Sequence, residues 1–353
     1  GRHGQLENMA RAACIALWPK VVDPQTISEL SLSTNALYTV SGILHNYEEN
    51  KDQLYVLRIT DPRSGRSRDD IMAECLWLES LKNDTNLVVR YPIRTNNGDL
   101  FGTHQYDNVP HQYVTLFEHV PGERLEDHLD TTTARLWGRL LAELHRHAST
   151  FSLPHHLDLI QINAAISGRQ EIVLNQPGAN KFISSQRAKL FGRFQHLVDA
   201  EIKSLWKQYG DPMLIHYDLH GWNVLVSKPS TSQSESNSDN QDNRHYQLAA
   251  IDFEDLVLGH RLQDVVRSLY DIRNYDNYQV LRDAFQNGYQ EILPWPESNE
   301  NQIQLLMLGQ QLSLANFILH HWDDEEDIEE ELVALEEDIE KYFTDEVSAI
   351  EDG

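Results

Sequence analysis

The chain has 353 residues, of which 55 are acidic and 29 are lysine or arginine, so its formal net charge is −26. This charge argues against a nucleic acid or an anionic membrane as partner, because both are themselves negatively charged. Hydrophobic residues make up 40% of the chain, which is enough for one large or two modest domains with a core. An acidic exterior would favour a cationic ligand, although it is also typical of an ordinary solvated surface.

The number of cysteines and the distribution of apolar residues indicate the compartment. Cys14 and Cys75 are the only cysteines, too few for a disulfide framework or a cysteine metal cluster. The first eight residues lack the apolar core of a signal peptide, and no stretch is long and apolar enough to cross a bilayer. We therefore expect a protein of the reducing cytoplasm.

The first third of the sequence predicts one helix and several strands. Apolar residues at helical spacing predict a helix over 5–18, which ends before Pro19. Apolar residues within 28–41 flank the polar centre Ser33-Thr34-Asn35-Ala36, a pattern typical of a hairpin. Residues 53–60 are rich in β-branched and aromatic side chains and predict a strand. Strands are also expected over 87–93 and 111–120.

A buried charge pair is expected between the strand over 53–60 and the helix that follows it. Arg58 lies inside the strand, where a charge needs a partner. Residues 69–82 predict a helix, and Glu74 falls on its apolar face with Ile71, Cys75 and Leu78. The carboxylate of Glu74 therefore points inward and needs a cation.

The remainder of the chain is predominantly helical. Apolar faces predict helices over 133–147 and 186–209, and His145 on the first of them is interpreted as a core or capping histidine. Residues 228–245 are dominated by Ser, Asn, Asp and Gln, which predicts a mobile surface loop or, as the alternative, a functional lid. Asp264 opens a predicted helix as its N-cap. The acidic tail over 323–343 predicts a helix with a solvated outer face.

The most informative stretch is residues 213–226. Met213-Leu214-Ile215 and Val224-Leu225-Val226 are apolar and strand-like, and between them lie four hydrogen-bonding side chains: His216, Asp218, His220 and Asn223. So many polar groups between two buried runs indicate a turn that carries chemistry, because burying unpaired polar groups costs free energy. A second acidic cluster, Asp252-Phe253-Glu254-Asp255, follows another apolar run. A polar turn capped by Asp and Asn is the structural alternative.

In order and spacing, these two stretches resemble the aminoglycoside phosphotransferase and choline kinase family. That family carries His-x-Asp-Leu-His-x-x-Asn followed by Ile-Asp-Phe/Trp-x-Asp, and this chain has 216–223 as His-Tyr-Asp-Leu-His-Gly-Trp-Asn and 251–255 as Ile-Asp-Phe-Glu-Asp. The resemblance implies an α+β, bilobal protein-kinase-like fold. A small lobe with an antiparallel sheet would span 1–120, and a larger, mainly helical lobe that binds the acceptor would span 121–353.

The resemblance also implies a role for particular residues. Asp218 would orient the acceptor hydroxyl and take its proton, with His220 near the transferring phosphate. Asn223 and Asp252 would hold Mg²⁺, a cation that prefers oxygen ligands. The nucleotide, ATP, would contact a further set of residues: Ser33 and Asn35 in the hairpin, Arg58 with Glu74, and the hinge Glu118-His119-Val120. Arg58 stands where kinases have lysine, so a purely structural ion pair is the alternative there.

The implied function is transfer of phosphate from MgATP to a hydroxyl of a small-molecule acceptor, which the acidic surface suggests is cationic. A nucleotide-binding pseudokinase and a homoserine- or sugar-type metabolite kinase are the alternatives. A kinase acting on protein would carry an activation segment ending in Ala-Pro-Glu, and none follows Asp252. The sequence does not name the acceptor or the oligomeric state.

Overall fold

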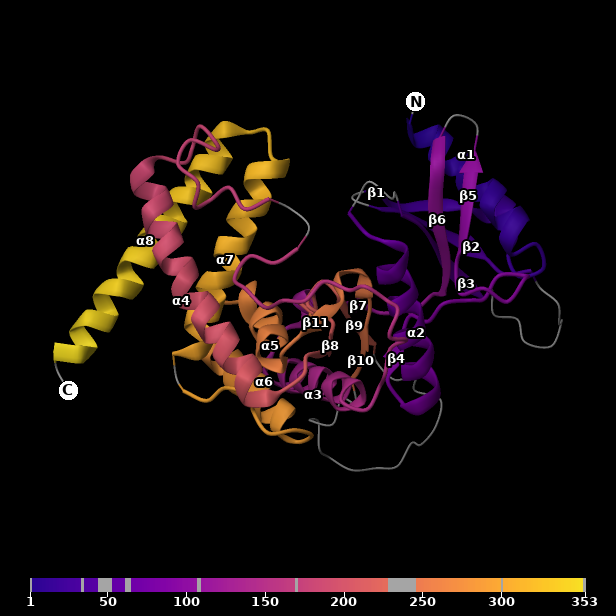
Figure 1. Ribbon diagram of the computed structural model, residues 1–353. Helices are drawn as coiled ribbons and strands as arrows, with labels where there is room; N and C mark the ends of the chain where they lie inside the picture. The colour runs from indigo at the N-terminus through magenta and orange to yellow at the C-terminus, as the bar shows by residue number, and fades with distance from the viewer. Residues whose placement is uncertain are drawn as a thin grey trace.

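The computed structural model describes residues 2–32, 35–43, 53–60, 65–106, 109–168, 171–227, 246–299 and 301–351. It shows two lobes, one built on an antiparallel sheet and one mainly helical (Figure 1). The predicted α+β class and bilobal architecture are therefore confirmed. The predicted loop over 228–245 and Ser33 lie outside the described residues.

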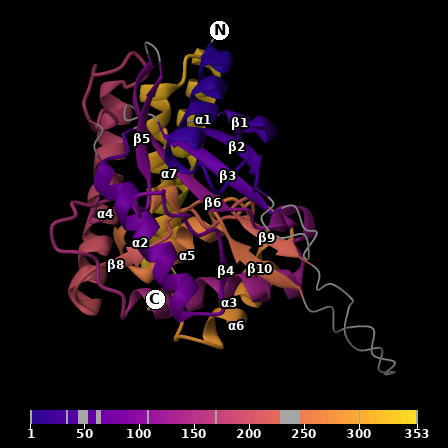
Figure 2. The same cartoon turned by 90° about the vertical axis from the view of Figure 1, so that its right-hand side faces the viewer.

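The N-terminal lobe consists of a five-stranded sheet covered on one face by a helix. The strand order is β1-β2-β3-β6-β5, with every neighbouring pair antiparallel. Helix α1 packs Met9 and Ala13 against the buried face of the sheet, and Trp18, which follows the helix, joins the same core. Figure 2 shows this helix beside the strands. The elements of this lobe are α1 (Arg2–Leu17), β1 (Ser28–Leu32), β2 (Asn35–Ser41), β3 (Leu54–Thr60), β5 (Gly102–Tyr106) and β6 (Val109–Glu118).

Helix α2 (Arg68–Asp84) links the sheet to the second lobe. It begins at a capping box, in which Ser67 accepts from the backbone of Asp70 and Asp70 accepts from the backbone of Ser67. Trp77 and Leu81 on its buried face belong to the core of the C-terminal lobe. Glu74 on the same helix contacts Arg58 of β3, so α2 packs against both lobes.

The C-terminal lobe surrounds two small sheets with long helices. One sheet has the order β4-β10-β9-β7 and the other joins β11 to β8. The β9–β10 hairpin lies beside α3 (Figure 2). The strands are β4 (Val88–Val89), β7 (Glu123–Arg124), β8 (Met213–Ile215), β9 (Val224–Ser227), β10 (Gln247–Ala250) and β11 (Val257–Gly259). The helices are α3 (Thr131–Ala148), α4 (Ser185–Tyr209), α5 (Arg261–Tyr270), α6 (Tyr278–Gln290), α7 (Gln302–His321) and α8 (Glu325–Glu351).

The prediction of one strand over 87–93 is wrong. Only Val88–Val89 forms a strand, and it pairs in parallel with β10 in the C-terminal lobe. Pro92, which lacks an N–H group, makes an isolated bridge with Phe117 on β6 instead. The segment is thus divided between the two lobes, and the proline explains why it does not continue as one strand.

Helices α6 and α7 were not predicted. Helix α7 contains apolar residues on nearly all sides, including Leu305, Leu312 and Ile318, because it is packed against several neighbouring helices. It therefore has little of the one-sided periodicity that signals a helix. By contrast, α8 buries the apolar stripe expected for the acidic tail, including Leu332 and Leu335. None of the described helices is long and apolar enough to cross a membrane.

Helices α3 and α6 touch backbone to backbone through two glycines. A Cβ atom added to Gly138 would lie 1.9 Å from the carbonyl oxygen of Phe285, and one added to Gly288 would lie 1.7 Å from that of Arg135. Real side chains do not approach so closely, so only glycine permits this crossing. The contact supports the turn between β8 and β9, because Trp137 on α3 donates from Nε1 to the carbonyl oxygen of Leu219 at 3.0 Å.

We expect Gly138→Ala to destabilise the protein by about 3 kcal/mol or more, because the added methyl group forces the two helices apart. Gly192→Ala in α4 is the matched control, since its added Cβ would meet only the Asn175 side chain, at 3.5 Å. That change should be neutral or stabilise by about 0.5 to 1 kcal/mol through helix propensity. Urea unfolding of the two variants measures the difference, and equal stabilities would contradict the close crossing.

Candidate active site

The turn between β8 and β9 is held in place by one buried carboxylate. Asp264 on α5 accepts from the backbone N–H of His216 at 3.0 Å and from that of Tyr217 at 2.8 Å. His145 donates from Nε2 to the same carboxylate at 3.0 Å, and the hydroxyl of Tyr289 contacts its other ring nitrogen at 2.8 Å. Tyr217 has a φ of 61°, an unfavourable value for a tyrosine, and these contacts fix the backbone there.

The prediction that Asp264 is the N-cap of its helix is therefore wrong. Helix α5 begins at Arg261, and His260 is the N-cap, with a side chain that accepts from the backbone N–H of Leu262. Asp264 lies inside the helix and is fully buried, so that its carboxylate serves the neighbouring turn. The interpretation of His145 as a core histidine agrees with its complete burial.

His216 joins the two acidic stretches of the sequence. Its Nδ1 accepts from the backbone N–H of Asp218 at 3.3 Å, and its Nε2 lies 3.1 Å from the carbonyl oxygen of Ile251. The proton therefore resides on Nε2, which donates to Ile251. Burial lowers the pKa of His216, so the neutral tautomer fits these contacts.

Asp218 lies at the centre of the turn with three donors around its carboxylate. Asn223 donates to Oδ2 at 2.7 Å and Arg267 donates to Oδ1 at 2.5 Å, while His220 Nε2 lies 3.4 Å from Oδ2. Burial alone would raise the pKa of Asp218, but His220 and Arg267 outweigh it and hold the pKa below its ordinary value. The carboxylate is thus ionised and able to accept a proton from a hydroxyl group.

Asn223 and Asp252, the two predicted metal ligands, both lie near Asp218. The Nδ2 group of Asn223 is engaged by Asp218, and the backbone carbonyl of Asn223 accepts from the N–H of Ile251 at 3.0 Å, next to Asp252. Asp252 adopts a φ of 61° two residues after the end of β10, and in the described part of the chain its carboxylate makes no hydrogen bond. Burial raises its pKa, against the opposing effect of Arg58.

A divalent cation would relieve this buried negative charge, so the donor set fits Mg²⁺. Within the described residues there is no group of three or more His, Cys, Asp or Glu side chains arranged for a metal. One carboxylate and one carboxamide agree instead with a cation that takes its remaining ligands from phosphate and water.

Arg58 and Glu74 form the expected ion pair. The guanidinium donates to both carboxylate oxygens, at 2.8 and 2.5 Å, and Arg66 adds a third contact to Glu74 at 3.0 Å. Burial would raise the pKa of Glu74, but the two arginines outweigh it and lower the pKa to about 2. The Nε atom of Arg58 is buried without a hydrogen-bond partner among the described residues. This donor agrees with a role toward a phosphate, and that role stays a prediction.

Asn35 connects the two lobes. Its Nδ2 donates to a carboxylate oxygen of Glu254, which follows Asp252 on the other lobe. Arg66 lies 3.9 Å from the same carboxylate. Burial and the nearby charge of Asp252 raise the pKa of Glu254 to about 8. Asn35 is therefore engaged across the cleft, and its predicted contact with nucleotide stays untested.

The predicted hinge, Glu118 to Val120, begins at the last residue of β6. The N–H of Glu118 is bound to the carbonyl of Tyr91 at 3.0 Å, and the N–H of His119 to that of Leu54 at 3.1 Å. In the described part of the chain the N–H of Val120 has no hydrogen-bond acceptor. It is the hinge donor that remains available to the edge of a nucleotide base.

Sequence analysis missed several charged residues of the site. Arg267 and Asp255 line a cavity of about 480 Å³ beside Asp218, together with Arg66 and Glu254. Asp255 is exposed to this cavity, but the protein around it and the carboxylates of Asp218 and Asp252 raise its pKa to about 6. Asp255 belongs to the acidic cluster at 252–255 that the sequence analysis identified, but no role was assigned to it there. Arg267 gave no signal, because it lies on a helix far along the chain and meets Asp218 only in the folded protein.

The structure thus brings most of the predicted site residues together. Asp218, His220 and Asn223 are in mutual contact, and Asp252 is joined to them through Ile251. The Arg58–Glu74 pair lies close enough to influence the charge of Asp252. The hinge residues and Asn35 approach from the N-terminal lobe. Such an arrangement combines an ionised carboxylate, further oxygen donors and arginine side chains in one cleft.

Several solved structures that share this fold are named as kinases of small molecules. The chain resembles the microcompartment-associated aminopropanol kinase, with a TM-score of 0.68 and 19% identity over 96% of this chain and 98% of that one. It also resembles an amicoumacin kinase solved with AMP-PNP and Ca²⁺, with a TM-score of 0.71 and 15% identity over 97% and 96% of the two chains. For choline kinase from Cryptosporidium parvum the TM-score is 0.57, with 14% identity over 98% and 97%.

The chain belongs to the phosphotransferase enzyme family, which it matches over residues 44–298. The sequence-based recognition is therefore confirmed, and the family supports the prediction of a kinase that acts on an alcohol group. An uncharacterized protein of Synechocystis sp. is 24% identical over 254 residues, a match that covers 71% of this chain and 63% of that protein. The chain thus spans less than two thirds of the length of this relative.

Glu74 and Glu79, both on α2 and both paired with arginine, offer a matched test of the buried pair. We expect Glu74→Ala to cost about 3 to 5 kcal/mol of stability, because it leaves Arg58 as an uncompensated buried charge. Glu79→Ala breaks an exposed 2.7 Å pair with Arg94 and should cost about 1 kcal/mol or less. Chemical denaturation at neutral pH measures both, and similar losses would show that the Arg58 pair is not effectively buried.

Proposed function

We propose that the protein transfers the γ-phosphoryl group of MgATP to a hydroxyl group of a small, amine-bearing acceptor. The observation that supports this proposal is the proximity of Asp218, Asn223 and Asp252: Asn223 donates to Asp218, and the charge of Asp218 acts on Asp252. The first can accept a proton, and the other two can hold a cation. These are the groups that in-line phosphoryl transfer requires of a protein.

In the proposed reaction Asp218 accepts a hydrogen bond from the acceptor hydroxyl and aligns its oxygen with the γ-phosphorus. A bond forms between that oxygen and phosphorus, the bond from phosphorus to the bridging oxygen of ADP breaks, and the hydroxyl proton passes to Asp218. Arg267 and Asn223 hold the carboxylate in one orientation throughout. A fixed orientation lowers the barrier, since less has to be ordered at the moment of reaction.

Asn223 and Asp252 would hold Mg²⁺, which when bound neutralises charge on the phosphates. On the nucleotide side, Val120 would donate its N–H to the base, and Arg58 would contact the phosphates while Glu74 holds its guanidinium. Ser33 and Asn35 would approach the phosphates from the hairpin between β1 and β2.

An amine on the acceptor is supported by the acidic charge of the cavity. Asp255 faces the cavity without a hydrogen-bond donor among the described residues, and the surrounding protein together with the charges of Asp218 and Asp252 raises its pKa. An ammonium group placed there would supply the missing positive charge. Aminopropanol, for which one structural neighbour is named, carries an amine and a hydroxyl group.

We expect Asp218→Asn to lower kcat by about 10³-fold, because the amide cannot accept the hydroxyl proton. Release of ADP in the presence of MgATP and an acceptor panel measures the effect. Asp276→Asn, at an exposed position between α5 and α6, is the control and should retain full activity. Unchanged turnover in the Asp218 variant would contradict the catalytic assignment. Stabilisation by MgATP without turnover on any acceptor would favour a nucleotide-binding pseudokinase.

We expect Asp255→Asn to raise the KM for amino alcohols by about tenfold or more, the usual loss for a hydrogen bond to a charged group. Matched diols, in which a hydroxyl replaces the amine, serve as the internal control. The KM for a diol should change much less than that for the corresponding amino alcohol. An equal change for both acceptors would show that Asp255 does not bind the amine.

A further inference from the structure

The cavity beside Asp218 extends away from the reacting groups along α7. Gln310, Leu314 and Phe317 of α7 all line it, and their spacing of four and three residues places them on one face of the helix. The hydroxyl of Tyr217, the residue before Asp218, donates to Gln310 Oε1 at 3.1 Å. Gln310 therefore marks the catalytic end of the cavity. At about 1.5 Å per residue, Leu314 lies about 6 Å farther along the helix and Phe317 about 10 Å farther.

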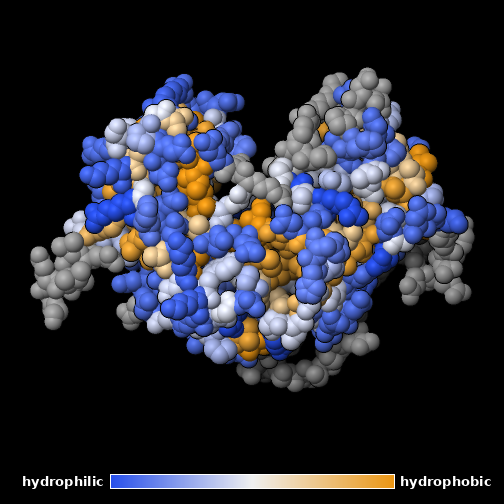
Figure 3. Space-filling model, viewed as in Figure 1, coloured by the Kyte–Doolittle hydropathy of each residue, from blue (hydrophilic) through white to orange (hydrophobic). Residues whose placement is uncertain are grey.

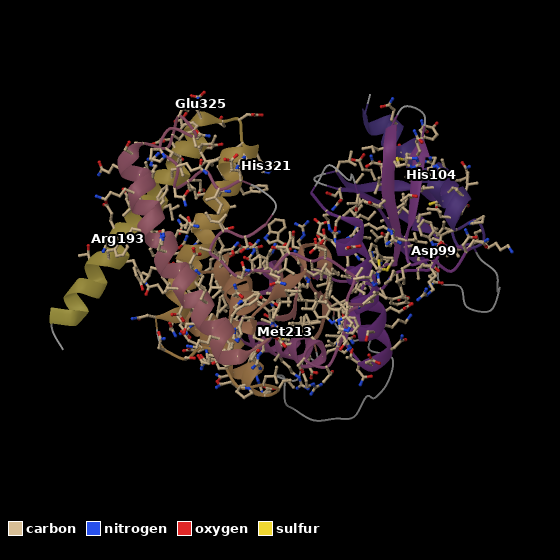
Figure 4. All side chains as sticks on the ribbon, viewed as in Figure 1. Asp99, His104, Arg193, Met213, His321 and Glu325 are labelled. Atoms are coloured by element: carbon tan, nitrogen blue, oxygen red, sulfur yellow. The ribbon has the colours of Figure 1, made fainter. Side chains whose placement is uncertain are left out.

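The remote end of the cavity is apolar and open to solvent. Leu314 and Phe317 are 36% and 43% exposed, although most apolar residues of α7 are buried. Ile160 and Ile166 contribute apolar surface from another segment. Figure 3 shows the surface hollowed between the lobes, with apolar residues on the wall formed by the helical lobe. In Figure 4, His321 lies at the side of α7 nearest the N-terminal lobe, and its ring is 4.3 Å from that of Phe317.

The size of the cavity adds a constraint on its occupant. A volume of about 480 Å³ is within the usual range for small-molecule sites. An acceptor of five or six non-hydrogen atoms, at about 30 Å³ each, would fill less than half of it. Such an acceptor would engage Asp218 and Asp255 and leave the apolar end in contact with water.

We propose that the acceptor is amphipathic, with a hydroxyl at Asp218, an amine at Asp255 and an apolar body of at least one ring against Leu314 and Phe317. This inference rests on the proposed function and specifies its substrate class. Acidic groups at one end and exposed apolar side chains at the other match such a molecule in both charge and polarity. Burial of the ring against these two side chains provides the hydrophobic contribution to binding.

The test uses pairs of amino alcohols that share one amino-hydroxyl end and differ by a phenyl group at the other. We measure kcat/KM for each pair with the full chain and MgATP. The wild type is expected to prefer the phenyl-bearing acceptor by at least about tenfold, the usual gain from burying an aromatic side chain. In Phe317→Ala this ratio should fall by about tenfold. Val280→Ala, which changes an apolar residue on α6 that is 55% exposed, should leave the ratio unchanged.

Binding measured without catalysis separates this inference from the proposed function. Calorimetry with Mg²⁺ and AMP-PNP present gives the affinity for each member of a pair. If phenyl-dependent binding is present and lost in Phe317→Ala, the apolar subsite is supported even when no acceptor is phosphorylated. Equal affinity for both members, or a preference for the shorter one, overturns the inference while leaving phosphoryl transfer intact. A wild-type dimer that Phe317→Ala converts to a monomer also overturns it, because the apolar face would then serve self-association.

Discussion

The geometry of the cleft depends on the buried carboxylate of Asp264. Its oxygens hold the two backbone N–H groups that precede Asp218 and, through His145 and Tyr289, tie the turn to α3 and α6. A buried carboxylate is stable only when it accepts several hydrogen bonds, so Asp264 and the turn require one another. The positive φ of Tyr217 is kept by this network, and the direction in which Asp218 points follows from it.

The second organising feature is the density of charge around the site. Carboxylates of Asp218, Asp252, Glu254 and Asp255 lie near one another. The arginines that act on them are Arg58 of β3, Arg267 of α5, and Arg66 and Arg90 of connecting segments. Arg58 and Arg66 pair with Glu74, and Arg267 pairs with Asp218, whereas Asp252 and Asp255 have no ion-pair partner among the described residues. A metal ion and an ammonium group would supply positive charge to these two carboxylates, and the proposed substrates carry both.

Many features of the fold and of the candidate site could be predicted from the sequence because their signals are local. The turn at 216–223 lies between two apolar runs, and the pairing of Arg58 with Glu74 follows from a charge inside a strand and a glutamate on an apolar helix face. Asp264 was assigned as an N-cap because the sequence alone does not distinguish an Asp that starts a helix from a buried Asp inside one. Its partners, the backbone N–H groups of His216 and Tyr217, lie far earlier in the chain. Arg267, α7 and the division of residues 87–93 depend on contacts between distant segments, which leave no periodic pattern in the sequence.

The division of residues 88–93 between the two lobes has a mechanical consequence. The lobes are joined at the hinge not by a single strand but by two crossing segments, one around Tyr91 and one around Glu118, which are hydrogen-bonded to each other. Two segments that are hydrogen-bonded to each other restrict the relative rotation of the lobes more than a single linking strand would. The link therefore helps to fix the orientation of the N-terminal sheet relative to the turn that carries Asp218.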